Sequence, residues 1–355
     1  MRYLLKSLVI LSVLGVLTLG VVSAIIIPEL PDVEELKDVQ MQIPLRVYSN
    51  DGSLIAEFGE KRRVPVEFRE TPELLVNAFI AAEDDRFYEH PGVDWQGITR
   101  AVVNLIRTGE KTVGGSTITM QVARNFFLSR ERTYLRKLNE VYLALKIEQE
   151  LSKEEIMELY VNVIYLGQRA YGVGAAAQVY YGTTLDNLNL AQLSMIAGLP
   201  KAPSTTNPVT NRQRSLTRRT YVLRRMFEEG YITQQQFQEA DSTPATASLH
   251  TPTVELEAPY VAEMVRREMV DRYDDDATTM GYRVYTTIQN KNQIAANHAL
   301  RSAVLQYDLR HGYRGPETHI ELAGNEPLEQ HLELLDSYPV IANLYPALVT
   351  GLDKG

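Results

Sequence analysis

The chain has 355 residues, of which 45% are hydrophobic and 23% are charged, and its formal net charge at pH 7 is −9. This composition excludes a disordered protein, and the length is sufficient for two domains with cores of their own. Because the sequence contains no cysteine, it also excludes disulfides, thiolate nucleophiles and cysteine metal sites.

The N-terminal region contains a long apolar segment. No charged residue occurs between Ser7 and Ile27, and a helix of that length crosses the hydrocarbon core of a bilayer, which is about 30 Å thick. Arg2 and Lys6 precede it, so we expect a cytoplasmic N-terminus and an exported remainder. The alternative is a cleaved signal peptide, since Val22-Ser23-Ala24 loosely resembles a cleavage site. The apolar run is longer than such peptides usually have, which favours a retained transmembrane helix.

A spacer and a short hairpin are predicted next. Residues 28–44 are acidic and contain prolines, and residues 45–68 alternate apolar and polar side chains around Asn50-Asp51-Gly52, a sequence typical of a hairpin turn. From Thr71 to Glu239 apolar residues recur mainly at helical spacing. We therefore expect a mainly helical domain after the hairpin.

Several helix boundaries within that region carry recognisable signals. We expect Thr71 to cap the first helix, Pro72 to be its first residue and Pro91-Gly92 to end it. Ser152 and Glu155 have the spacing of a capping box. Further helices are predicted over residues 134–150, after 152, and over 190–199.

A second unit is predicted after a joint at residues 245–253 that is rich in proline, threonine and serine. It contains a helix over 258–273, a strand over 282–288 and a helix over 290–307. The chain ends in strand-like sequence without a terminating signal, so we expect it to be part of a longer protein.

The stretch "AAEDDRFYEHPGVD", residues 81–94, holds the first candidate for chemistry. Glu83 follows Phe79 by four residues and therefore borders the buried stripe of its helix. Burial of that kind raises the pKa of a carboxyl group, as a general base working near pH 7 requires. Asp84, His90 and Asp94 are expected to hold the turn or to position a hydroxyl. The alternative is a charged helix end with local caps.

The second candidate is "KTVGGSTITMQVARN", residues 111–125. Backbone N–H groups and hydroxyls at 114–117, close to Arg124, suit the binding of phosphate or diphosphate. The alternative is an ordinary mobile loop with a helix N-cap.

The third candidate lies in residues 136–162, where Arg136 and Lys137 share a helical face with Glu140. A surface salt bridge is the alternative explanation. Two carboxylates with phosphate-binding cations suit glycosyl transfer from a diphosphate sugar: one carboxylate deprotonates the attacking hydroxyl and the other assists departure of the diphosphate.

Charge distribution and missing motifs narrow the chemistry further. Residues 100–153 and 201–225 are basic although the whole chain is acidic. This pattern indicates a localised anionic partner, such as a lipid headgroup or a phosphorylated substrate, rather than nucleic acid. No H-E-x-x-H, G-x-S-x-G or Ser-x-x-Lys sequence occurs, so zinc-protease and serine acyl-enzyme chemistry of the penicillin-binding type are not expected from this chain.

Taken together, these stretches resemble the motifs of a known family, the peptidoglycan glycosyltransferases (glycosyltransferase family 51). "EDDRFYEHPGVD", "GGSTITMQVARN" and "RKLNEVYLALKIEQELSKEEIMELYVNVIYLG" are similar to its first three motifs, and "AQLSMIAGLPKAPSTTNP" and "RRTYVLRRMFEEGYIT" to the fourth and fifth. The resemblance covers roughly residues 45–240. With the apolar segment before it and "YRVYTTIQNKNQIAANHAL" after it, the chain resembles the N-terminal part of class A penicillin-binding proteins of the 1A type.

The resemblance implies roles for individual residues. Glu83 would take a proton from the 4-hydroxyl of the acceptor lipid II, and Glu140 would assist the diphosphate leaving group, directly or through a divalent cation (Mg or Mn) near it. No organic cofactor is implied. Met120 and Arg124 depart from the family, in which many members have glutamine and lysine there. The implied substrate-binding residues are Asp84, Phe87, His90, Asp94, Gly115, Ser116, Thr117, Gln121, Arg124, Asn125, Arg136, Lys137, Lys153, Arg218 and Arg219.

The implied fold is mainly α: a lysozyme-like glycosyltransferase domain with a membrane-proximal jaw subdomain, an N-terminal transmembrane helix and a small α/β linker region at the C-terminal side. The expected division is a cytoplasmic tail (1–6), a transmembrane helix (7–27), a spacer (28–44), the glycosyltransferase domain (45–244), a linker with the start of the transpeptidase side (245–310), and a partial inserted domain (311–355).

The implied reaction polymerises lipid II into β-1,4-linked glycan strands by an inverting displacement, with release of undecaprenyl diphosphate. The implied partners are lipid II, the growing glycan strand, cell-wall synthesis proteins and an activator, without nucleic acid. The implied location is the inner membrane of a Gram-negative bacterium, with a single span and a periplasmic catalytic domain.

Two other functions remain open at this point. A peptidoglycan-cleaving enzyme on the same scaffold would use Glu83 as an acid toward a glycosidic oxygen, but it would not need the Gly-Ser-Thr segment or the clustered cations. A non-catalytic, membrane-anchored scaffold would tolerate the loss of Glu83.

Overall fold

The computed structural model describes residues 26–38, 41–109, 115–128, 134–250 and 254–312, with scattered residues before 26 and after 312. The expected transmembrane segment, residues 7–27, and the expected partial domain, residues 311–355, lie largely outside this part. Among the described residues, no helix combines the length and the apolar character needed to cross a membrane.

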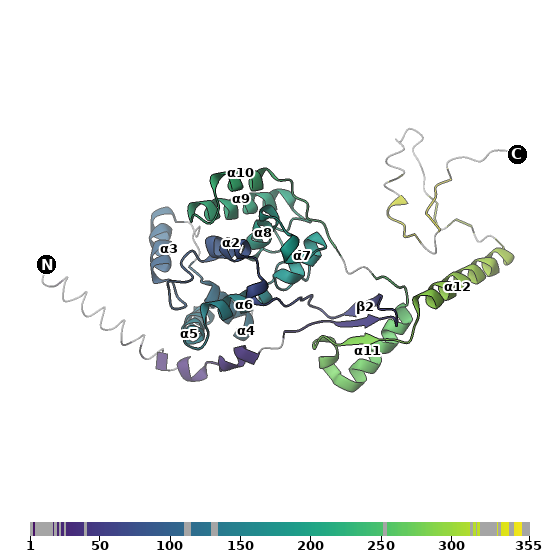
Figure 1. Cartoon of the computed structure of the whole chain (residues 1–355), viewed down its shortest axis with the longest axis horizontal. Coiled ribbons are helices and arrows are strands. Elements are labelled where there is room, and N and C mark those ends of the chain that lie inside the picture. The colour runs from purple at the N-terminus through teal and green to yellow at the C-terminus, as the bar shows by residue number, and fades with distance from the viewer. Residues whose placement is uncertain are drawn as a thin grey trace.

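The described chain is mainly helical, as expected, and Figure 1 shows a helical body beside a smaller unit that contains a β-sheet. The α-helices are α2 (Glu73–Glu83), α3 (Trp95–Thr108), α4 (Ile118–Phe127), α5 (Tyr134–Glu150), α6 (Lys153–Val163), α7 (Val173–Tyr181), α8 (Leu190–Gly198), α9 (Arg212–Glu228), α10 (Gln234–Ser242), α11 (Pro259–Tyr273) and α12 (Asn290–Arg310). The strands are β1 (Leu45–Tyr48), β2 (Leu54–Phe58) and β3 (Arg283–Tyr285). Short 3-10 helices are η1 (Ile27–Glu29), η2 (Glu34–Asp38), η3 (Phe68–Glu70), η4 (Leu185–Asn187), η5 (Leu199–Lys201) and η6 (Asp274–Thr278).

Helix α2 lies at the centre of the helical body and packs against α8 and α9. It is buried on most of its surface, as expected of a helix with so few polar residues. The core side chains that it contributes are Leu75, Val76, Ala78, Phe79, Ile80 and Ala81. Its C-terminal residue, Glu83, therefore emerges directly from the core.

The predicted boundaries of this helix were wrong at both ends. Thr71 does not cap it: the Thr71 hydroxyl donates to the Glu67 carbonyl at 3.2 Å, and Pro72 occupies the N-cap position. The helix ends at Glu83, well before Pro91, because Asp84 has an extended backbone with φ −161°. Tertiary contacts of the Asp84 side chain, described below, hold the chain in this conformation.

Other predicted elements are confirmed. The helix over 134–150 is present, and the helix predicted over 190–199 ends one residue earlier, at Gly198. Ser152 forms a capping box with Glu155, whose N–H donates to the Ser152 hydroxyl at 3.3 Å. The hairpin is also present, with Gly52 at φ +88° in the turn, a left-handed conformation that glycine adopts readily.

The hairpin pairs with residues much further along the chain. The sheet order is β2-β1-β3, with β1 antiparallel to β2 and parallel to β3. A second hydrophobic core lies between this sheet and α11, separate from the core of the helical body. Its buried members are Leu45, Val47, Ile55, Leu256, Ala258 and Ala262. Helix α12 extends away from this unit (Figure 1) and contains no buried residue.

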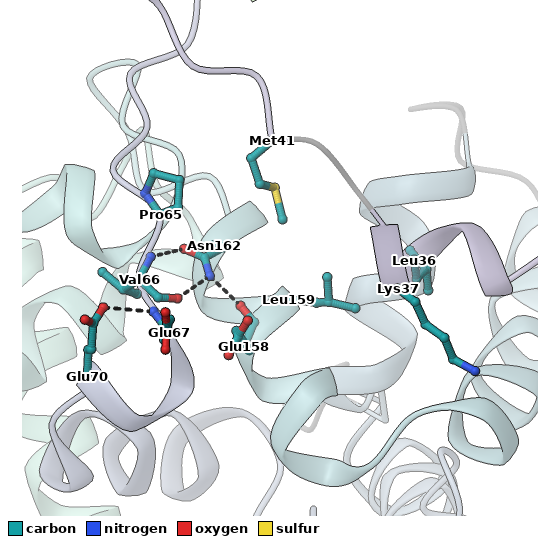
Figure 2. A pocket seen from close by; sticks show the side chains of 10 residues that line it. All are labelled: Leu36, Lys37, Met41, Pro65, Val66, Glu67, Glu70, Glu158, Leu159 and Asn162. Atoms are coloured by element: carbon teal, nitrogen blue, oxygen red, sulfur yellow. Dashed lines mark hydrogen bonds between the residues drawn. The ribbon is translucent and has the colours of Figure 1, made fainter. Parts of the chain in front are cut away.

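Asn162 fixes the segment that leads from the hairpin into the helical body. Its Oδ1 accepts from the Val66 N–H at 2.9 Å and its Nδ2 donates to the Val66 carbonyl at 2.8 Å. Figure 2 shows these bonds beside a hollow of about 400 Å³ between η2, η3 and α6. The Asn162 side chain thus pairs both backbone polar groups of Val66, as a neighbouring strand would.

Candidate active site

A cleft of about 650 Å³ lies between the C-terminal end of α2, the start of α3, the start of α4, and α9. Its charged lining residues are Glu83, Asp84, Asp85, Asp94, Arg100, Arg124, Lys201, Arg218 and Arg225. Its other polar lining residues include Ser116, Thr117 and Gln121, with Gly115 beside them. Because cations outnumber acids in this lining, the cleft favours an anionic ligand.

Glu83 lies at the base of the cleft, and its side chain is only 13% exposed. Its Oε1 accepts from Arg218 Nη2 at 3.0 Å, and its Oε2 accepts from Gln121 Nε2 at 3.1 Å. The two partners come from α9 and α4, so three helices define the position of this carboxylate.

Burial raises the pKa of the Glu83 carboxyl above its ordinary value of 4.5. The charge of Arg218 and the hydrogen bond from Gln121 oppose this rise, but burial is the larger effect. Lys201 and Arg124 oppose it to a smaller extent. The carboxylate is therefore more basic than an exposed glutamate, as the sequence analysis predicted.

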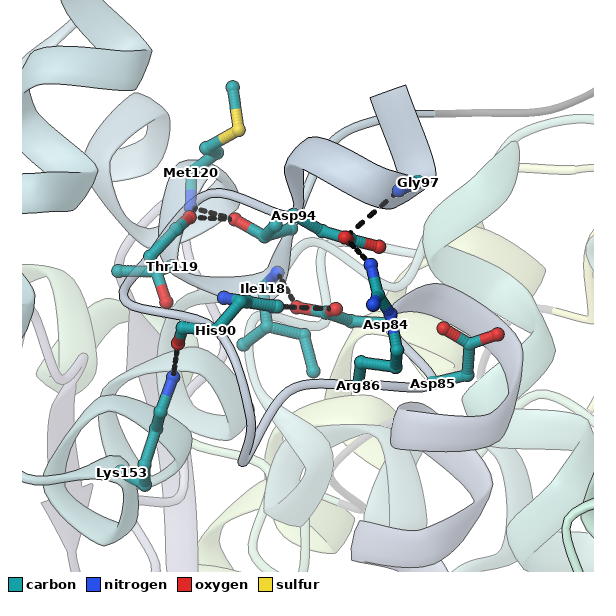
Figure 3. A network of polar contacts seen from close by, with 12 residues as sticks. Asp84, Asp85, Arg86, His90, Asp94, Gly97, Ile118, Thr119, Met120 and Lys153 are labelled. Carbon is teal, nitrogen blue, oxygen red and sulfur yellow. Dashed lines mark hydrogen bonds and ion pairs between the residues drawn. The ribbon is translucent and has the colours of Figure 1, made fainter. Parts of the chain in front are cut away.

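Asp84 and His90 hold the loop that follows Glu83 (Figure 3). His90 Nε2 lies 2.9 Å from Asp84 Oδ1, and Asp84 Oδ2 accepts from the Ile118 N–H at 2.9 Å. The second contact joins the loop to the first turn of α4, where a carboxylate is favourable. The side chains of His90 and Asp84 are 6% and 3% exposed, so their role is to fix the loop.

Asp94 fixes the far end of the same loop. Its Oδ1 accepts from the Gly97 N–H at 2.9 Å and forms an ion pair with Arg86. A Cβ at position 97 would lie 2.2 Å from Asp94 Oδ2, so this close approach requires glycine. Arg100 reaches the outer side of Asp94 at 3.6 Å.

The segment before α4 forms the next wall of the cleft. Thr117 is the N-cap of α4: its hydroxyl accepts from the Met120 N–H at 3.1 Å and donates to the Gly92 carbonyl at 2.6 Å. The N-cap that the sequence suggested is therefore present, and Thr117 lines the cleft. Phosphate binding by this segment stays a prediction. Gly115 and Ser116 line the cleft just before this cap.

Glu140 lies behind this wall, on α5, and is 1% exposed. Arg136 Nη1 donates to its Oε1 at 2.6 Å and Lys137 Nζ donates to its Oε2 at 2.8 Å. Lys137 Nζ also donates to Ser116 Oγ at 2.7 Å. The predicted face of α5 is confirmed, and Lys137 connects it to the cleft wall.

These surroundings do not fit a divalent cation at Glu140. Both carboxylate oxygens already accept hydrogen bonds from cations, whereas Mg²⁺ or Mn²⁺ requires several free oxygen ligands. Among the described residues, no group of three or more histidine, aspartate and glutamate side chains is arranged to hold a metal ion.

Several residues named from the sequence lie away from the cleft lining. Lys153 Nζ donates to the His90 carbonyl at 2.7 Å and to Glu148 Oε1 at 2.8 Å (Figure 3 shows the first contact). Phe87 is fully buried, Asn125 is exposed, and Arg219 Nη2 donates to the Asp241 carbonyl at 2.7 Å. Their assignment to substrate binding stays a prediction.

Other lining residues were not named as site residues from the sequence. Lys201 and Arg225 belong to the acid-free basic stretch 201–225, which was the available signal. Arg225 pairs with Asp85 at 3.1 Å across the cleft. Arg100 begins the other basic stretch, 100–153, whereas Tyr221 carried no comparable signal because its place in the lining depends on how α9 packs.

Comparison with known proteins shows the family to which this region is similar. Residues 51–227 match the family model described as Transglycosylase. The chain therefore belongs to the transglycosylase family. Its relatives include penicillin-binding protein 1A of Escherichia coli, to which it is 54% identical over 325 residues, and penicillin-binding protein 1A of Pseudomonas aeruginosa, to which it is 52% identical over 327 residues.

These alignments cover 91% and 92% of this chain but only 38% and 39% of the two relatives. The chain thus spans about two fifths of the length of the curated relatives it matches. The crystal structure of penicillin-binding protein 1A from Haemophilus influenzae is similar as well, with a TM-score of 0.55 and 35% identity, covering 89% of this chain and 38% of that one.

Proposed function

We propose that this chain is a peptidoglycan glycosyltransferase that polymerises lipid II into β-1,4-linked glycan strands and releases undecaprenyl diphosphate. The observation that carries the proposal is Glu83, a buried carboxylate of raised pKa at the base of a cation-rich cleft. Membership of the transglycosylase family supports it.

In this reaction Glu83 accepts the proton of the 4-hydroxyl of the acceptor lipid II. The hydroxyl oxygen then forms a bond to C1 of the donor sugar while the bond from C1 to the diphosphate breaks. Attack opposite the α-linked leaving group gives the β product, so the displacement is inverting. A carboxylate with a raised pKa suits the first step because it holds a proton more readily at neutral pH.

The cations stabilise the departing diphosphate. Arg124 and Lys201 line the cleft together with Arg218. Glu140 assists indirectly, because it holds Lys137 where its ammonium group reaches Ser116 at the cleft wall. This arrangement supplies positive charge for the diphosphate from side chains alone.

The remaining parts of the proposal concern the protein's setting. We propose a lysozyme-like catalytic domain with a membrane-proximal jaw, anchored by a transmembrane helix at residues 7–27 in the inner membrane, with the catalytic domain in the periplasm. Lipid II and the growing strand are its substrates, and cell-wall synthesis proteins with an activator are its partners. A substrate that resides in a membrane supports an anchored enzyme.

The test is glycan-strand formation from labelled lipid II by the purified chain in detergent. We expect polymer from the wild-type chain, and a rate lower by about 10²–10⁴-fold from Glu83→Gln, because general base catalysis supplies about that factor. Glu140→Gln is expected to form polymer more slowly than wild type in the same assay.

Two outcomes would contradict the proposal. Equal polymer from wild type and Glu83→Gln would support a scaffold without catalysis at this site. Release of soluble fragments from purified peptidoglycan, without polymer from lipid II, would support the cleaving enzyme.

A further inference from the structure

Tyr160, on α6, carries a polar group that the mechanism above does not use. Its side chain is fully buried, yet among the described residues no group forms a hydrogen bond with its hydroxyl. Buried hydroxyls without partners are rare, since each loses its bonds to water without replacement. We therefore expect the Tyr160 hydroxyl to gain a hydrogen-bond partner in another state of the site.

Tyr160 packs against α2, the helix that ends at Glu83. Its ring packs edge-on against Phe79, with the ring centroids 5.3 Å apart. Phe79 and Glu83 are four residues apart on α2 and share one face of that helix. The charged groups that act electrostatically on the Tyr160 hydroxyl are Glu83, Arg124, Asp84 and Arg218, all of which line the cleft.

Among these groups Glu83 has the most spare capacity to accept a hydrogen bond, with two contacts against three for Asp84. Arg124 and Arg218 are donors. Both oxygens of Asp84 are already engaged, with His90 and with the Ile118 N–H. Glu83 has one partner on each oxygen, and one of these partners, Arg218, is a cation that faces the same cleft as the anionic substrate.

We propose that Tyr160 is a positioning residue for the general base: when the diphosphate draws Arg218 away, the Tyr160 hydroxyl donates to one oxygen of Glu83 and leaves the other for the acceptor hydroxyl. Burial and the neighbouring Glu83 raise the pKa of Tyr160 well above its ordinary value. The phenol therefore stays protonated and remains a donor at every pH at which the enzyme works. This inference rests on the proposed function of Glu83.

The test is the pH profile of polymerisation by the full chain with Tyr160→Phe. A hydrogen bond to a carboxylate stabilises its charged form, so its loss raises the pKa of Glu83. The proposed bond exists only with substrate bound, so we expect the acidic limb of kcat, which reports the enzyme–substrate complex, to move to higher pH by about one unit. The other groups that face Glu83 remain in the variant: Gln121 and Arg124 from α4, Lys201 from η5 and Arg218 from α9.

Tyr180→Phe is the matched control. Tyr180 is equally buried in the same core, but its hydroxyl donates to the Leu166 carbonyl at 2.7 Å and accepts from Asn207 Nδ2 at 2.8 Å. Its variant should lower the melting temperature and leave the acidic limb in place. An unshifted limb in Tyr160→Phe would overturn the inference, whatever the melting temperature of that variant.

Two further measurements separate this inference from the proposed function. A fluorinated tyrosine at position 160 is a stronger donor, so it should move the acidic limb to lower pH, and an unmoved limb would contradict the inference. An infrared titration of the Glu83 carboxyl with inorganic diphosphate present, assigned with Glu83→Gln, reads the same pKa shift in Tyr160→Phe without turnover. If wild type makes no polymer, the proposed function fails, and the titration still decides the role of Tyr160.

Discussion

Arg218 couples the basicity of Glu83 to the position of one guanidinium group. Its Nε donates to the Gly198 carbonyl at 3.2 Å, its guanidinium lies 4.5 Å from the ring centroid of Tyr221, and its Nη2 bonds Glu83. Because this cation holds down a pKa that burial raises, Arg218→Gln should raise the pKa of Glu83 further. Activity is lost as pH falls through that pKa, so we expect the acidic limb of polymerisation to move to higher pH.

The adjacent Arg219 provides the control for this prediction. It contacts Asp241 on α10 instead of Glu83. Arg219→Gln should lower thermal stability through the loss of that buried contact, without moving the acidic limb. A pH shift of equal size in both variants would indicate a general disturbance of α9 rather than an effect of the Arg218 charge on Glu83.

The sequence was sufficient to place Glu83 but not its partners. Its distance from Phe79 along one helix predicts a position at the edge of the core. Arg218 is 135 residues away in the chain, and its contact with Glu83 depends on the packing of α9 against α2. For the same reason the sequence does not indicate a role for Tyr160, since its spacing predicts only a position on the apolar face of α6.

At the scale of elements, a chain of polar contacts holds the loop from Asp84 to Asp94 against α4, α5 and α6. Lys153 joins the His90 carbonyl to Glu148 and lies 4.6 Å from the ring centroid of Phe87. Thr119 donates to the same Glu148 oxygen at 2.6 Å. Through these polar contacts, α6 stabilises the loop that carries Asp84.

Lys153→Met should therefore lower the free energy of unfolding by about 1–3 kcal/mol, because it leaves the Glu148 carboxylate, which is 8% exposed, without its cation. Chemical denaturation measures this value. We also expect faster amide exchange in the loop. If polymerisation falls while stability and exchange stay unchanged, Lys153 contacts the substrate, as the resemblance implied.

Elements were more predictable in their interiors than at their ends. The helix over 134–150 follows from apolar spacing alone. The ends of α2 were predicted wrongly for two reasons. Thr71 donates to Glu67 in the preceding turn instead of capping α2, and Asp84 bonds the first turn of α4, which is distant in sequence. Local cap signals cannot include such contacts.

At the scale of the molecule, the small unit needs residues from both sides of the helical body. A chain that ends at residue 244 would lack α11 and β3, and the buried face of the hairpin, with Leu45, Val47 and Ile55, would be exposed. We expect such a chain to self-associate, as light scattering would detect, while its helical body stays folded. Polar substitution of Val47 should restore the monomer. A monomeric truncated chain with protected hairpin amides would contradict this expectation.

The parallel pairing of β1 with β3 also sets an order of events during synthesis. The bond from the Thr286 hydroxyl to the Tyr48 carbonyl joins residues 238 positions apart. At about 5–20 residues per second on the ribosome, β1 waits roughly 10–50 s for its partner strand. The buried residues of the helical body's core end at Ala240, and Ala247 packs against them, so this core is made before α11 and β3. The helical body can therefore complete its core first. The pairing of β1 with β3 is a late event, which occurs only after the ribosome has made β3.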